Sequence, residues 1–107
     1  MGSALLALQN QYIFLTQNLS MLLAACQTQE QRDAIQSQYV TCRRSYFNCV
    51  NTVFHDDDPA VAKLVGQMKT EQTELGKLVD GLNDIAKGIN VITQAVQVGV
   101  QLASLAG

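Results

Sequence analysis

The most regular pattern in the chain is a heptad repeat of apolar positions that begins at Val61 and ends at Ala103. Every seventh residue in this register is apolar, and most residues three and four positions further on are apolar too. A stripe of this length is typical of one long helix that lies along another helix. We therefore predict a helix over residues 60–106, about 70 Å long at the usual rise of about 1.5 Å per residue.

The first half of the chain predicts a second helical arm over residues 4–55. No Gly or Pro interrupts the chain between Ser3 and Asp58. An apolar stripe with helical spacing runs through Leu5, Leu8, Tyr12, Leu15, Leu19, Leu22 and Cys26 and, after a change of register, resumes at Ile35. Thr28 and Gln31 fit a capping box, so this arm either breaks near residue 28 or continues as one helix.

Residues 56–59 predict the turn between the two arms. Asp58 suits the N-cap of the following helix, and Pro59 suits its first position. His55, Asp56 and Asp57 have side chains that bind metal ions, but consecutive residues rarely converge on one ion. We therefore predict capping and no metal site here.

Together these elements predict an all-α fold in which residues 1–107 form a single domain. The fold is a long antiparallel helical hairpin if the first arm is continuous, and a three-helix bundle if that arm breaks. In the bundle, two shorter helices would leave part of the long helix uncovered, and both arrangements therefore favour a homo-oligomer. Residues 1–3 resemble the remnant of a cloning site and carry no weight in this prediction.

The distribution of charge along the chain adds a functional hypothesis. The first charged side chain is that of Glu30, and residues 88–107 carry no charged side chain. The hairpin would bring these two uncharged segments together at one end, with Leu19 near Val96, and would place the acidic turn at the other end. We predict that the uncharged end contacts another copy of the chain, a partner helix or lipid.

Ten residues of the uncharged segments form the predicted interaction surface, and four polar residues of the tail form a narrow neutral seam. The interaction residues are Leu6, Ile13, Phe14, Met21, Val91, Ala95, Val98, Gly99, Leu102 and Leu105, and the seam residues are Asn90, Gln94, Gln97 and Gln101. Small residues such as Ala95 and Gly99 either let another helix approach closely or mark local bends. Changing Val96 and Val100 together to Asp is expected to dissociate the oligomer or to block insertion into lipid, while the turn end stays helical.

The amino-acid composition and net charge limit the classes of molecule that this chain is expected to bind. Charged residues make up 15% of the chain, against about 25% in an average soluble domain. A net charge of −2 and an isoelectric point near 5.1 argue against a nucleic-acid partner, which would select a basic surface. Cys26, Cys42 and Cys49 are odd in number and lack a CxxC spacing, so we expect buried thiols and no disulfide framework or zinc site.

Targeting signals are weak in this sequence. Residues 23–26, Leu-Ala-Ala-Cys, match a lipobox, but no Lys or Arg precedes them and polar residues interrupt the hydrophobic segment. No run of about 18–20 apolar residues predicts a transmembrane helix. We therefore expect a protein that is cytoplasmic or secreted without a classical signal, and not a lipoprotein.

No catalytic motif is present, since His55 is the only His and no nucleophile-elbow, phosphate-loop or zinc-protease motif occurs. We therefore predict a non-enzymatic protein without a cofactor, a helical interaction protein that self-assembles through its uncharged segments. One alternative is a membrane-active, pore-forming or translocator-type subunit whose neutral seam faces water in the pore. Another is a helical adaptor or inhibitor that binds one protein partner.

Overall fold

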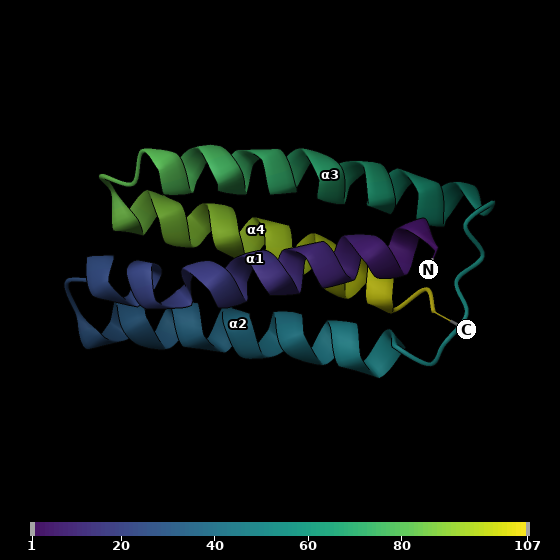
Figure 1. Ribbon diagram of the computed structural model, residues 1–107, viewed down its shortest axis with the longest axis horizontal. Helices are drawn as coiled ribbons and strands as arrows, with labels where there is room; N and C mark the ends of the chain where they lie inside the picture. Colours follow the sequence, from purple (N-terminus) through teal and green to yellow (C-terminus); the bar gives the residue numbers. More distant parts are fainter. Residues whose placement is uncertain (1, 107) are drawn as a thin grey trace.

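The computed structural model describes residues 2–106, so that Met1 of the predicted cloning-site remnant and Gly107 lie outside the described residues. All regular secondary structure in this range is helical, which confirms the predicted all-α class. The four helices are α1 (Ser3–Ala25), α2 (Gln29–Cys49), α3 (Pro59–Asp80) and α4 (Ile85–Ala103), and they form a bundle of 42 × 22 × 18 Å (Figure 1). The bundle has one helix more than the larger of the two predicted arrangements.

Successive helices run in opposite directions along the bundle (Figure 1). Both α1 and α4 contact α2 and α3, and α1 also contacts α4, whereas α2 and α3 do not contact each other within residues 2–106. The α2–α3 connection, residues 50–58, therefore crosses from one side of the bundle to the other and is the longest of the three connections. Since α1 and α4 meet in the middle, their outward faces lie on opposite broad sides of the molecule.

The first arm breaks at residues 26–28. Of the two predicted alternatives, this is the one in which Thr28 caps a new helix. The Thr28 hydroxyl accepts a hydrogen bond from the Gln31 backbone N–H (3.1 Å), and the Gln31 side chain accepts one from the Thr28 backbone N–H (3.3 Å). This reciprocal capping box satisfies two backbone donors at the start of α2. The chain then doubles back, and α2 packs along α1.

The prediction of one helix over residues 60–106 is wrong. Helix α3 ends at Asp80, and α4 begins at Ile85 after Asp84, whose side chain accepts a hydrogen bond from the Lys87 backbone N–H (3.2 Å). The four residues between the helices, Gly81, Leu82, Asn83 and Asp84, include three poor helix formers, and Asp84 favours an N-cap. The apolar heptad continues in the sequence because α4 is apolar around most of its circumference. The buried register nevertheless changes at the break, since α3 buries Val61, Met68 and Leu75, whereas α4 buries Ile85, Ile92 and Gly99.

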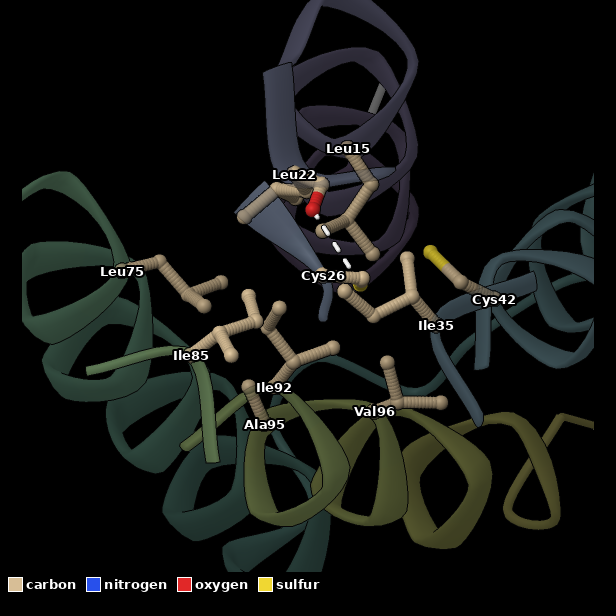
Figure 2. Close-up of a cluster of buried hydrophobic side chains, with 10 residues drawn as sticks. All are labelled: Leu15, Leu22, Cys26, Ile35, Cys42, Leu75, Ile85, Ile92, Ala95 and Val96. Carbon is tan, nitrogen blue, oxygen red and sulfur yellow. Dashed lines mark hydrogen bonds between the residues drawn. The ribbon is translucent and has the colours of Figure 1, made fainter. Parts of the chain in front are cut away.

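Two clusters of buried apolar side chains form the core, one toward each end of the bundle. The cluster in Figure 2 combines side chains from all four helices with Cys26, whose thiol donates a hydrogen bond to the Leu22 carbonyl (3.3 Å). Its residues are Leu15, Leu22, Cys26, Ile35, Cys42, Leu75, Ile85, Ile92, Ala95 and Val96. Leu19 packs against this cluster, so the uncharged segments of α1 and α4 do lie together, but inside one bundle.

A polar contact joins α1 and α4 inside this core. The Gln11 side chain is buried, and its Nε2 donates a hydrogen bond to the Ala95 carbonyl (2.8 Å). A Cβ atom at Gly99 would lie 2.8 Å from Gln11 Oε1. The absence of a side chain at Gly99 therefore lets α1 approach α4 closely. Of the two explanations for the small residues of the tail, this is close approach of another helix and not a local bend.

We expect Gly99→Ala to lower the free energy of unfolding by about 1–2 kcal/mol. Overpacking at this contact costs about 1–3 kcal/mol, and the higher helix propensity of Ala returns up to about 1 kcal/mol. Gly66→Ala on α3 is the matched control, because an added Cβ there meets nothing within 4 Å, and this change is expected to stabilise by up to about 1 kcal/mol. Urea titrations followed by circular dichroism measure both values, and equal stabilisation by the two changes would contradict the close contact at Gly99.

Candidate interaction surfaces

The outward face of α1 carries three of the predicted interaction residues. Leu6, Ile13 and Met21 are between 40 and 43% exposed, while Phe14 is half-buried on the side of the helix. None of the 23 residues of α1 has a charged side chain. Isolated exposed apolar side chains are common, but an outward helical face with apolar residues and no charge is unusual for a soluble domain.

Most of the interaction residues predicted in the tail are buried or half-buried in the core. Ala95, Gly99 and Leu102 are buried between α4 and the other helices, so their assignment to an intermolecular surface is wrong for the folded chain. Val91 and Val98 are half-buried against the core clusters, and Leu105 remains partly exposed after the end of α4. The sequence-based assignment failed because α4 packs against three helices of its own chain.

The neutral seam lies on the outside of the bundle. Asn90, Gln94, Gln97 and Gln101 are all exposed along the outward face of α4. Their amide side chains are typical of a solvated face and bring no charge to it. From Asn90 onward the broad side formed by α4 is therefore polar and without charge, while Lys87 is exposed near the start of the helix. The opposite side, formed by α1, is uncharged and mixes exposed apolar residues with exposed polar residues such as Asn10 and Gln17.

Aromatic side chains line the junction of α1 and α2, a feature that the sequence analysis did not single out. Tyr12 stacks between Tyr39 and Tyr46, with ring centroids 6.0 and 5.7 Å away, and the Phe47 ring meets Tyr12 edge-on at 5.4 Å. The Arg43 guanidinium lies 5.7 Å from the Phe47 centroid. The seven-residue spacing of Tyr39 and Tyr46 is the signal that places both rings on one side of α2.

The acidic turn and the two termini of the described chain lie at the same end of the bundle (Figure 1). The Asp56 carboxylate accepts a hydrogen bond from the Ala4 backbone N–H (3.4 Å). The prediction of an acidic pole opposite an uncharged pole is therefore wrong. The reason is that the breaks at residues 26–28 and 81–84 fold each arm in half and return both termini to the turn.

The ionisable core groups are the three thiols, which are all free and buried. Burial raises the pKa of Cys42 from 9.0 to about 12, and it also raises the pKa values of Cys26 and Cys49. A thiol with a raised pKa is a poor nucleophile at neutral pH.

At the turn, Asp58 caps α3 through its hydrogen bond from the Ala60 backbone N–H (2.8 Å).

Other kinds of site were sought in the same part of the chain. Within residues 2–106, no three His, Cys, Asp or Glu side chains lie together as metal ligands. No helix in that range is long and apolar enough to cross a membrane. No protein-family model, curated protein or solved structure matches the chain.

Proposed function

We propose that this chain is a non-enzymatic helical interaction protein that self-associates. The observation that carries the proposal is the uncharged outward face of α1, where Leu6, Ile13 and Met21 are each at least 40% exposed. Two such faces can meet without the cost of desolvating charged side chains, and the cores of protein interfaces are depleted in charged residues. The apolar residues of the tail support the proposal indirectly, since they hold α1 in place from inside.

A charge at Ile13, midway between Leu6 and Met21, tests whether the α1 face mediates self-association. Ile13→Glu places a charge in the middle of the uncharged face, and we expect it to raise the dissociation constant for self-association by about tenfold or more. Thr70→Glu on α3 is the matched control, because it adds the same charge at another exposed helical position. Sedimentation equilibrium over a wide range of protein concentration measures the dissociation constants of both variants and the wild type.

Two results would contradict this proposal. A wild-type chain that remains monomeric at the highest concentration would favour the adaptor alternative, in which one foreign protein covers the α1 face. An Ile13→Glu variant that associates as tightly as Thr70→Glu would show that the α1 face is not the surface used. The membrane-active alternative requires the bundle to open, because the apolar side of α4 is buried in the core.

A further inference from the structure

A second exposed surface lies on α2 and combines apolar and basic side chains. We call Val40, Arg43, Arg44 and Phe47 the α2 patch; they surround a shallow hollow of about 280 Å³. Val40 and Phe47 are 49 and 52% exposed, one helical turn to either side of Arg43. Among residues 2–106 the one ion pair joins Lys77 and Glu74, so neither arginine of the patch is paired with a carboxylate of its own chain.

The connection between α2 and α3 has the complementary composition. Val53 is 64% exposed, the most exposed of the large apolar side chains in the described residues, and three aspartates follow it at residues 56–58. Asp56 accepts the Ala4 backbone N–H and Asp58 caps α3, but Asp57 is exposed and makes no hydrogen bond within residues 2–106. An apolar side chain followed by a free carboxylate is therefore presented at the end of the bundle.

We infer that the α2–α3 connection of one copy docks on the α2 patch of a second copy. This inference rests on the proposed self-association and adds a charged contact beside the uncharged α1 face, since Phe47 of the α2 patch lies against Tyr12 of α1. Val53 would pack against Val40 and Phe47, and the Asp57 carboxylate would face the guanidinium groups of Arg43 and Arg44. Arginine beside an aromatic ring is typical of the residues that dominate binding energy at interfaces, and a carboxylate is its natural partner.

The positions of the two features favour a closed dimer. Arg43 lies six residues before the end of α2 at Cys49, about 9 Å along the helix, and the connection begins at that same end. Two copies that run antiparallel and overlap at these ends bring each connection onto the patch of the other copy. The contact is then made twice around a two-fold axis, as an isologous interface requires.

Complementary charge reversals test this arrangement. Arg43→Glu and Asp57→Lys, each alone, place like charges together in both contacts, and each is expected to raise the dissociation constant about tenfold or more. An equimolar mixture of the two variants restores opposite charges in both contacts. In one contact the introduced glutamate faces the introduced lysine, and in the other the unchanged Arg43 faces the unchanged Asp57. The mixture is therefore expected to form a heterodimer with nearly wild-type affinity in sedimentation equilibrium.

Lys63→Glu and Asp80→Lys are the matched controls, because they make the same changes of charge at exposed positions of α3 outside both features. They are expected to change the dissociation constant by less than about threefold, as distant surface charges do. If the wild type associates but the mixture does not recover, the docking is overturned while the proposed function stands on the Ile13→Glu result. If the wild type never associates, both are overturned.

Discussion

Val96→Asp is expected to lower the free energy of unfolding by about 3–5 kcal/mol, because it leaves a carboxylate in the core without a partner. Val96 is 1% exposed and packs in the cluster that joins all four helices (Figure 2). A loss of this size is a large part of the total stability of a small domain, about 5–15 kcal/mol. The variant is therefore expected to be largely unfolded or to unfold at a much lower urea concentration than the wild type.

Gln97→Asp is the matched control for this prediction. Gln97 is the next residue of α4 and is exposed, so the same carboxylate there is expected to change the stability by less than about 0.5 kcal/mol. Urea titrations followed by circular dichroism give both values. Equal stability of the two variants would contradict the placement of α4 in the bundle.

The structure also changes the expectation for the double variant Val96→Asp with Val100→Asp. The sequence predicted dissociation of an oligomer with an intact turn end. Because Val96 lies in the core of the folded chain, we now expect the double variant to unfold the bundle as a whole. Loss of self-association in this variant would therefore say nothing about the surface that mediates it.

The second large effect is a loss of stability at alkaline pH that depends on Cys42. Burial raises the pKa of this thiol from 9.0 to about 12. The folded chain thus keeps the thiol proton between these two values, whereas the unfolded chain loses it, so the contribution of Cys42 is complete below pH 9 and declines as the pH rises to 12. The full decline corresponds to about 4 kcal/mol.

Cys42→Ala isolates this contribution from the other groups that titrate at high pH. The wild type is expected to be more stable than the variant at about pH 8, and this difference is expected to shrink by about 2 kcal/mol at about pH 10.5. Both proteins keep Cys26 and Cys49, so the titration of those thiols cancels in the comparison. Urea titrations under reducing conditions at the two pH values measure the difference, and an unchanged difference would contradict the buried position of the thiol.

Local sequence signals predicted the helical class and marked the starts of two helices. The capping box of Thr28 and the Asp58–Pro59 pair act through hydrogen bonds and backbone angles within a few residues, so they do not depend on the rest of the fold. The Asp58–Pro59 pair is present as predicted at the start of α3, and the capping box begins α2, which was one of the two alternatives for residue 28. The apolar stripes likewise identified the core sides of the helices, which include Leu15, Leu22 and Ile92.

The break between α3 and α4 was missed for a physical reason. A heptad stripe records only where apolar residues recur in the sequence. Because α4 is apolar around most of its circumference, the stripe runs on across the turn although the register of the buried residues changes there. Gly81, Asn83 and Asp84 were local signals for that turn, but each also occurs inside helices at a modest cost.

The α2 patch was missed because Val40 and Phe47 lie off the apolar stripe of α2, and their exposure is known only once α1 is in place.

The sequence by itself determined that this protein is helical, that residues 1–29 and 88–107 lack charged side chains, and that a helix begins after Asp58. These properties follow from covalent chemistry and from interactions within a few residues. Only the tertiary structure decided which uncharged side chains are buried and which remain on the surface. Burial depends on contacts between residues such as Gln11 and Ala95, which lie far apart in the chain and meet only when all four helices have packed.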